Sequence, residues 1–264
     1  MGDASHLAAA KRQLASEGFA ILPGVLSADR CADLRERLWR AAEESERRGA
    51  PTRNIGIDPN ERNVRVFNLI DLDPAFAELI QDPLAIELVT TLLGSGFLIS
   101  NFTANIALPG AQSMKPHSDQ SIVVPEPWLE PWSINVIWCL DEVRAANGAT
   151  LYLPGSQRIA WARDVPADPR AGMRPFEAKE GSVIAMDGRL WHTSGANVTA
   201  DEQRALLFGY YSRDFIRPQT NWNAALSAAT IAGLSPQMHG WLGLGPVANM
   251  RLAAPLAAAR VATR

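Results

Sequence analysis

Between residues 97 and 212 the chain carries five short runs of branched and aromatic residues, separated by clusters of Gly, Pro, Asn and Asp. Runs of this length with such breaks are typical of antiparallel strands joined by turns and loops. This half of the chain therefore favours an antiparallel sandwich or barrel. The five expected strands are Phe97–Ala107, Ser133–Leu140, Thr150–Leu153, Ser182–Met186 and Arg204–Ser212.

The residues before this β-rich region are expected to form mainly helices. Ser27 is a suitable N-cap, and apolar residues follow it at helical spacing: Cys31, Leu34, Leu38, Ala41 and Ala42. Further helices are expected over residues 4–16, 74–81 and 83–93, the last capped by Gly94, with a strand at Phe19–Leu22. We see no repeat or linker, so a single domain over residues 1–264 is expected. It would consist of a helical N-terminal region over residues 1–95, a β core over about 96–216 and a helical segment over 217–264.

Charge and cysteine content narrow the class of protein. Twenty-five basic and 28 acidic residues give a net charge of −3 without a basic block, so no nucleic-acid partner is expected. The two cysteines, Cys31 and Cys139, form no C-x-x-C pair, and charged residues interrupt every apolar run near the N-terminus. We expect a cytoplasmic protein with two buried thiols and no membrane association.

Two of the four histidines lie in positions that suit a metal site. His117 and Asp119 are separated by one residue, and His192 follows 75 residues after the first histidine. On a strand, residues i and i+2 point to the same face, so the imidazole and the carboxylate would lie side by side. Two histidines and one carboxylate are the ligands of mononuclear non-haem Fe(II) oxygenases. A hydrogen-bonded surface pair is the plainer interpretation of His117 and Asp119.

Arg204 interrupts the apolar run that forms the last expected strand. A guanidinium is costly to bury without an anion, and its planar pair of donors suits one carboxylate of a dicarboxylic acid beside the metal. The alternative is an arginine at the strand edge that reaches solvent or pairs with Asp201 or Glu202.

Three motifs together resemble the phytanoyl-CoA dioxygenase-like (PhyH) family of Fe(II)/2-oxoglutarate-dependent oxygenases. They are His117-Ser118-Asp119, Asn147-Gly148-Ala149-Thr150 leading to Leu153-Pro154-Gly155-Ser156, and Leu190-Trp191-His192 before Gly195-Ala196-Asn197. The resemblance extends over roughly residues 15–225, including the segments Gly18–Leu26, Arg65–Leu69 and Arg217–Asn221. It implies a double-stranded β-helix, a jelly-roll or cupin-like core, with flanking helices.

The resemblance also implies roles for particular residues. His117, Asp119 and His192 match the iron ligands, and Arg204 matches the arginine that holds the distal carboxylate of 2-oxoglutarate. The family pattern places further cosubstrate contacts at Thr150, Ser194, Trp138 and Arg65. Many relatives have a glutamine three residues before the first ligand, where this chain has Met114; Asn101, Asn105 or Gln112 could supply the missing amide.

The resemblance implies that Fe(II), 2-oxoglutarate and O₂ oxidise a C–H bond, with release of succinate and CO₂. Hydroxylation is the expected outcome, with desaturation, epoxidation and rearrangement as variations, and the carboxylate of Asp119 argues against halogenation. We expect a small, largely apolar substrate. The aromatic loop 121–133 suits the mouth of the site. The candidate pocket residues are Phe67, Asn105, Met114, Trp128, Trp132, Phe215 and Trp222.

Two other classes of protein remain compatible with the motifs. A cupin-like metal-dependent isomerase or a small-molecule-binding barrel would use the same three ligands without 2-oxoglutarate. A degenerate family member with a structural role is the third possibility, which the change at Met114 keeps open.

Overall fold

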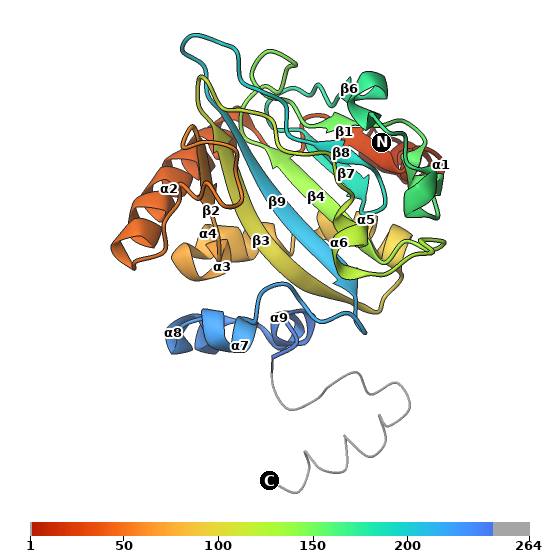
Figure 1. Cartoon of the computed structure of the whole chain (residues 1–264). Helices are drawn as coiled ribbons and strands as arrows, with labels where there is room; N and C mark the ends of the chain where they lie inside the picture. Colours follow the sequence, from red (N-terminus) through yellow and green to blue (C-terminus); the bar gives the residue numbers. More distant parts are fainter. Residues whose placement is uncertain (1, 245–264) are drawn as a thin grey trace, which may run out of the picture.

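The computed structural model describes residues 2–244, which form a sheet-rich core flanked by helices (Figure 1). The main sheet has six strands in the order β1-β7-β4-β9-β3-β2, and each neighbouring pair is antiparallel. These strands are β1 Phe19–Leu22, β2 Asn63–Val66, β3 Phe97–Ala107, β4 Ser133–Cys139, β7 Val183–Asp187 and β9 Arg204–Arg213. Four of the five strands expected between residues 97 and 212 lie in this sheet, and the fifth, expected at Thr150–Leu153, forms in a second sheet as β5 Leu151–Tyr152. Strand β1 has the predicted bounds.

A second, smaller sheet faces the first. Its strands are β6 Arg174–Pro175, β5 Leu151–Tyr152 and β8 His192–Thr193, in the order β6-β5-β8. The residues between the two sheets form an apolar cluster that includes Ile137, Leu206 and Phe176. Side chains alternate along a strand, so each strand of the main sheet sends every second residue into this space.

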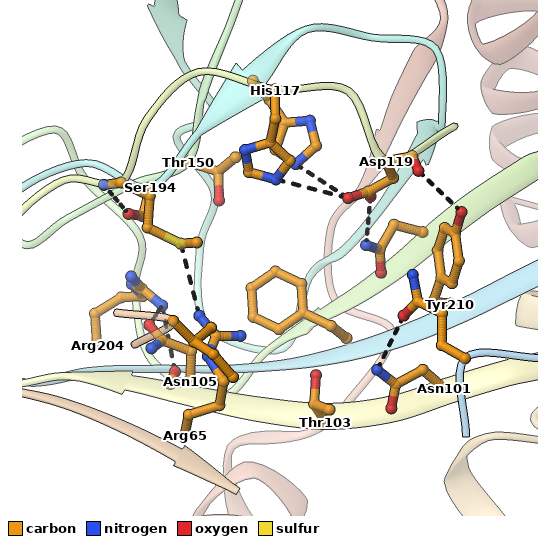
Figure 2. Close-up of a pocket in the computed structure, with 16 residues that line it drawn as sticks. Arg65, Asn101, Thr103, Asn105, His117, Asp119, Thr150, Ser194, Arg204 and Tyr210 are labelled. Atoms are coloured by element: carbon orange, nitrogen blue, oxygen red, sulfur yellow. Dashed lines mark hydrogen bonds and ion pairs between the residues drawn. The ribbon is translucent and has the colours of Figure 1, made fainter. Parts of the chain in front are cut away.

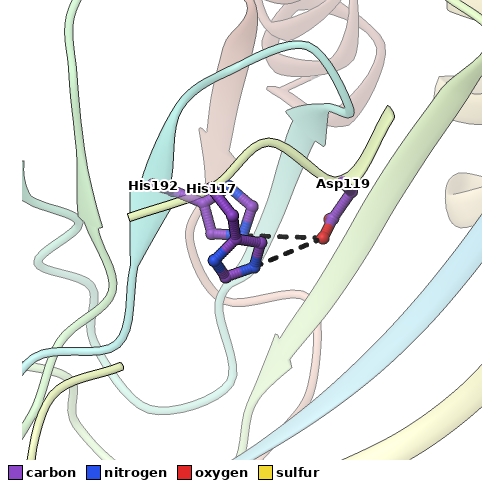
Figure 3. A group of neighbouring side chains, drawn as sticks. All are labelled: His117, Asp119 and His192. Atoms are coloured by element: carbon purple, nitrogen blue, oxygen red, sulfur yellow. Dashed lines mark ion pairs between the residues drawn. The ribbon is translucent and has the colours of Figure 1, made fainter. Parts of the chain in front are cut away.

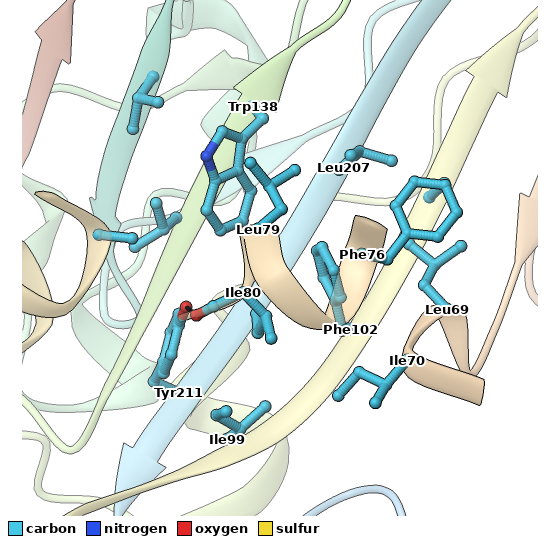
Figure 4. Close-up of a cluster of buried hydrophobic side chains, with 14 of the residues drawn as sticks. Leu69, Ile70, Phe76, Leu79, Ile80, Ile99, Phe102, Trp138, Leu207 and Tyr211 are labelled. Atoms are coloured by element: carbon cyan, nitrogen blue, oxygen red, sulfur yellow. Dashed lines mark hydrogen bonds between the residues drawn. The ribbon is translucent and has the colours of Figure 1, made fainter. Parts of the chain in front are cut away.

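The helices cover the opposite face of the main sheet. They are α1 Gly2–Glu17, α2 Ala28–Arg47, α3 Leu69–Leu72, α4 Pro74–Leu79, α5 Pro83–Leu93, α7 Trp222–Ala225, α8 Ala228–Gly233 and α9 Pro236–Trp241. One large hydrophobic cluster joins them to the sheet, and Figure 4 shows Phe76 and Ile80 beside Phe102, Leu207 and Tyr211. The remaining elements are α6 Asp119–Val123 and three single-turn 3₁₀ helices, Ser156–Arg158, Ala162–Asp164 and Pro169–Gly172.

Local sequence explains the helix boundaries. Ser27 caps α2 by accepting a hydrogen bond from the backbone N–H of Arg30, and the five apolar residues spaced along α2 are all buried, as predicted. Gly94 ends α5 with a φ of 75°, which favours glycine. Both cysteines are buried free thiols, which also confirms the prediction.

The core reaches further along the chain than the bounds of 96–216 expected for it. Strands β1 and β2, from the N-terminal region, form the two edges of the main sheet. Met238 and Leu242, from the C-terminal segment, lie in the same hydrophobic cluster as the strands. The expected helical segment 217–264 extends outside the described residues beyond Leu244.

Candidate active site

His117, Asp119 and His192 meet at one end of the space between the two sheets (Figure 3). One potential ligand atom from each residue lies within 4.8 Å of the others. Oδ1 of Asp119 is 3.7 Å from Nε2 of His117 and 3.8 Å from Nε2 of His192. The structure thus brings together the three side chains that the spacing suggested as metal ligands.

Backbone pairing explains why residues 75 positions apart are neighbours. His117 and His192 form an isolated antiparallel bridge, with N–H to carbonyl distances of 2.9 and 2.8 Å in the two directions. The i, i+2 argument assumed that Asp119 lies on a strand, and this assumption is wrong. Asp119 is the first residue of α6, whose N-cap is Ser118. The carboxylate reaches the histidines because the chain turns into a helix immediately after the bridge.

The hydrogen bonds of the two imidazoles fix their tautomers. Nδ1 of His117 lies 2.9 Å from the carbonyl of Lys115, and Nδ1 of His192 lies 2.9 Å from the carbonyl of Leu190. A carbonyl only accepts, so Nδ1 must carry the proton in each ring. Each Nε2 therefore presents a lone pair toward Asp119, as metal ligation requires. Burial lowers the pKa of His192, which favours this neutral form.

The carboxylate of Asp119 is held from its other side. Nδ2 of Asn135, on β4, donates to Oδ2 of Asp119 at 3.0 Å. This contact leaves Oδ1 directed at the two histidines. Tyr210, on β9, adds a long hydrogen bond of 3.4 Å to the backbone carbonyl of Asp119. Outer contacts of this kind orient a metal ligand.

A cavity of about 170 Å³ opens beside the triad (Figure 2). Its wall includes nine residues that the sequence suggested for the metal, the cosubstrate or the pocket: His117, Asp119, His192, Arg204, Thr150, Ser194, Arg65, Asn105 and Met114. Asn101 also lines the cavity, whereas Gln112, the third candidate for the missing amide, does not.

Arg204 is a buried cation in the wall of this cavity. The residue is 1% exposed. Its Nε donates to the carbonyl of Gly148 at 3.1 Å, and its Nη1 donates to Oδ1 of Asn105 at 3.1 Å. No carboxylate among residues 5–244 forms an ion pair with it, so the alternative pairing with Asp201 or Glu202 does not occur. Burial lowers the pKa of Arg204 to about 10, still well above neutral pH. The cavity therefore contains a charged, uncompensated donor that suits an anion.

Arg65 is a different kind of arginine. Its Nε and Nη2 donate to the two carboxylate oxygens of Asp58 at 2.8 and 2.7 Å, which compensates its charge. Nη2 of Arg65 also lies 3.7 Å from the sulfur of Met114. Arg65 therefore borders the cavity without adding a free positive charge to it.

Two hydroxyl-bearing residues border the same cavity. The Oγ of Ser194 accepts a hydrogen bond of 2.9 Å from the backbone N–H of Met114, so its own proton stays available. The side chain of Thr150 makes no hydrogen bond with any residue in the described stretch of the chain. Both positions can donate to a ligand in the cavity.

The expected contact of Trp138 with the cosubstrate is wrong. Trp138 is fully buried on the helix-covered face of the main sheet, with its ring centroid 5.6 Å from that of Phe102. On β4 it lies three residues after Asn135, and an odd offset along a strand reverses the face. Gly209 makes room for it, because a Cβ there would lie 2.9 Å from the indole.

Five other aromatic candidates also lie outside the cavity wall. Trp128 and Trp222 are buried, and each indole N–H donates to a backbone carbonyl, of Val124 and Ile99 respectively. Trp132 packs edge-on against Phe215, which is 51% exposed. The last of the five, Phe67, is 37% exposed. The expectation of a largely apolar substrate therefore gains no support from these aromatic residues and stays a prediction.

Sequence reasoning missed six residues of the wall: Ile57, Thr103, Asn135, Phe208, Tyr210 and Gln219. Alternation along strands was an available signal for two of them. Phe208 and Tyr210 are four and six residues after Arg204 on β9, and an even offset preserves the face.

A profile of the phytanoyl-CoA dioxygenase (PhyH) family matches residues 14–205, which is most of the chain. The chain belongs to this family. It is 49% identical to "Dioxygenase af480" of Aspergillus fumigatus, over 90% of this chain and 77% of that protein. It is also 26% identical to "Multifunctional dioxygenase ausE" of Emericella nidulans, over 86% and 80% of the two chains. The family membership and these relatives confirm the resemblance and make the chain a dioxygenase.

Two solved structures confirm the fold. EctD from S. alaskensis, crystallised with 2-oxoglutarate and 5-hydroxyectoine, has a TM-score of 0.65 at 24% identity, with 80% of each chain covered. The epimerase SnoN from nogalamycin biosynthesis, described as non-heme and alpha ketoglutarate dependent, has a TM-score of 0.62 at 18% identity. That match covers 83% of this chain and 88% of SnoN. Among the described residues, no helix is long and apolar enough to span a membrane.

The residues of the cavity fit iron and 2-oxoglutarate. Two neutral imidazoles and one carboxylate can hold a divalent iron and leave coordination positions open. Arg204 supplies the unpaired cation that the distal carboxylate of a dicarboxylate needs, and it borders the same cavity as the three ligands. Thr150 and Ser194 add hydroxyl donors to the wall of the same cavity (Figure 2).

Proposed function

We propose that the protein is an Fe(II)- and 2-oxoglutarate-dependent dioxygenase that hydroxylates a C–H bond of a small metabolite. His117, Asp119 and His192 would hold the iron, while Arg204, Thr150 and Ser194 would hold 2-oxoglutarate. The observation that carries the proposal is the buried and uncompensated guanidinium of Arg204 in the cavity that the triad borders. A cupin-like isomerase or binding barrel without 2-oxoglutarate would leave this charge without a role.

The chain's own residues position the reactants. When bound, iron and 2-oxoglutarate supply the oxidising power for hydroxylation with O₂, and succinate and CO₂ are released. The Nδ1 hydrogen bonds hold both imidazoles in the ligating tautomer, and Asn135 holds the carboxylate of Asp119. Arg204 is itself fixed by Gly148 and Asn105, so it binds an anion without first losing side-chain freedom.

The proposal includes oxygenation rather than halogenation, since a carboxylate occupies the third ligand position at Asp119. It also includes a role in small-molecule metabolism. The relatives named above as fungal dioxygenases and the SnoN enzyme of nogalamycin biosynthesis support this role.

An anaerobic titration of the metal-free protein with Fe(II) and 2-oxoglutarate tests the proposal. We expect a weak visible charge-transfer band that needs both additions and is absent in His117→Ala. His239→Ala is the matched control, because His239 lies on α9 outside the cavity. If Fe(II) binds to the wild-type protein and the band does not form, 2-oxoglutarate does not chelate the metal and the proposal is wrong.

A further inference from the structure

The cavity has two ends that differ in charge. Asn101, Thr103 and Asn105 occupy alternate positions of β3 and line the cavity. The pairing of β3 with β9 places Tyr210 opposite Asn101 and Phe208 opposite Thr103. Arg204 therefore lies beside Asn105 at one end, and Tyr210 lies beside Asn101 at the other (Figure 2). Tyr210 is six residues after Arg204 on β9, an offset of about 20 Å along the strand.

The end away from Arg204 is lined by four uncharged polar residues, which we call the neutral wall: Asn101, Thr103, Tyr210 and Gln219. Two of them are linked, because Nδ2 of Asn101 donates to Oε1 of Gln219 at 3.2 Å. Oδ1 of Asn101 accepts from the hydroxyl of Thr220 at 3.4 Å. This network orients the Gln219 amide so that its Nε2 is left to donate elsewhere.

Two polar groups of the neutral wall have no partner within the described residues. One is Nε2 of Gln219, and the other is the hydroxyl of Thr103. Thr103 is only 6% exposed, so its hydroxyl faces a confined space rather than bulk solvent. A buried hydroxyl without a partner costs free energy unless a ligand or water satisfies it.

The neutral wall provides no countercharge for an ionised ligand. The arginine of the cavity that carries an uncompensated charge lies at the other end, and Arg65 is paired with Asp58. Among the residues that line the cavity, the one carboxylate is that of Asp119, the proposed iron ligand, which Asn135 directs toward the histidines. A carboxylate or ammonium group placed against the neutral wall would lose its hydration without an opposite charge.

We propose that the neutral wall binds an uncharged hydroxyl or carbonyl group of the substrate, and hence that the substrate is a neutral, oxygen-bearing molecule. This inference rests on the proposed function, since it assigns the substrate end of the same site. Phe208 lies between the two ends and contacts the hydrocarbon portion next to the polar group. Ile57, which is 45% exposed, provides an apolar rim for the rest of the molecule. A cavity of about 170 Å³ that also holds 2-oxoglutarate admits only one end of the substrate.

The test uses three probes of similar size that differ in charge. They are cyclohexylmethanol, which is neutral, cyclohexanecarboxylate, which is an anion, and cyclohexylmethylamine, which is a cation. The full chain is loaded with Mn(II) in place of iron and with saturating 2-oxoglutarate. Paramagnetic relaxation of the probe protons then reports binding close to the metal and needs no turnover. We expect the alcohol to bind more tightly than either ion. Equal or tighter binding of the carboxylate or the amine would overturn the inference.

Two variants test whether the neutral wall is responsible. Thr103→Val removes the unpartnered hydroxyl and keeps the side-chain shape, so affinity for the alcohol should fall about five-fold, the effect of one hydrogen bond. Gln219→Glu keeps the acceptor for Asn101 but adds a negative charge, so it should favour the amine over the alcohol. Gln219 is exposed, so this change is compatible with folding.

Gln237→Glu, at an exposed site on α9, adds the same charge away from the cavity and should leave the probe order unchanged. The inference would be contradicted if Gln219→Glu left the order of probe affinities unchanged. It would also be contradicted if Gln237→Glu altered that order as Gln219→Glu does. Failure of the proposed function is distinguishable, because Mn(II) or 2-oxoglutarate would then not bind in the loading step.

Discussion

The Arg204 end of the cavity and the neutral wall share strands β3 and β9, with Gln219 added from the segment after β9, but the two ends are held differently. Arg204 is 1% exposed, and the carbonyl of Gly148 and the side chain of Asn105 fix its guanidinium. At the other end Gln219 is exposed and Asn101 is half-buried, and one side-chain hydrogen bond of 3.2 Å links them. One pair of strands thus carries a rigid site for a charged group and a more adaptable site for a neutral one.

The largest expected effect is at the rigid end. Arg204→Ala should weaken 2-oxoglutarate binding roughly 100-fold, because a charge-assisted contact contributes on the order of 2–3 kcal/mol. Anaerobic calorimetry of the Mn(II)-loaded protein measures this affinity. Arg174→Ala, at an exposed position of β6, removes the same charge elsewhere and should leave the affinity unchanged. Equal affinities of wild type and Arg204→Ala would remove the contrast between the two ends.

A smaller effect is expected next to the metal ligands. Asn135→Leu removes the donor to Oδ2 of Asp119, so the carboxylate is no longer held toward the histidines. Loss of such an outer contact lowers metal affinity by about 10-fold or more. Competition with a chromophoric chelator measures it. Asn101→Leu removes an amide of the neutral wall and should bind metal as the wild type does. If both variants lose metal equally, Asn135 has no special role in positioning Asp119.

The smallest effect on binding is expected on the opposite face of the sheet. Trp138→Phe shortens a fully buried aromatic side chain and should lower the free energy of unfolding by about 1–2 kcal/mol. Affinity for 2-oxoglutarate should stay the same, because the indole does not line the cavity. Urea unfolding followed by calorimetry separates the two outcomes. If Trp138→Phe lowered the affinity for 2-oxoglutarate and left the free energy of unfolding unchanged, Trp138 would have to contact the cosubstrate after all.

The sequence predicted the site best where a residue type is unusual for the segment that contains it. An arginine inside an apolar strand and a histidine two residues from an aspartate are noticeable, and both lie where the structure forms a site. The helix α5 was predictable to its last residue, because Pro83 suits a first turn and Gly94 a C-cap.

The neutral wall was only partly predictable: Asn101 was a candidate amide and Tyr210 shares a strand face with Arg204, but Thr103 and Gln219 carried no signal. Asn101, Thr103 and Gln219 are common residue types, and their function depends on which strand faces which. The sequence-based prediction also placed several aromatic residues in the pocket that do not line it, because their residue type suggested a binding role. Trp128 and Trp222 look suited to a pocket, yet each satisfies its indole N–H on a backbone carbonyl and packs inward. Whether an aromatic ring lines a cavity is decided by tertiary packing, which residue type and spacing do not encode.

The bridge between His117 and His192 has a consequence for how iron is acquired. Reciprocal main-chain hydrogen bonds hold these two ligands opposite each other, so strand pairing sets their separation before any ion arrives. Most of the entropy of assembling the site is therefore lost during folding and not during loading. The third ligand, Asp119, begins a five-residue helix beside this pair, and its Oδ1 already lies 3.7 and 3.8 Å from the two Nε2 atoms. We therefore expect that iron can be removed from the folded protein and restored to it without refolding.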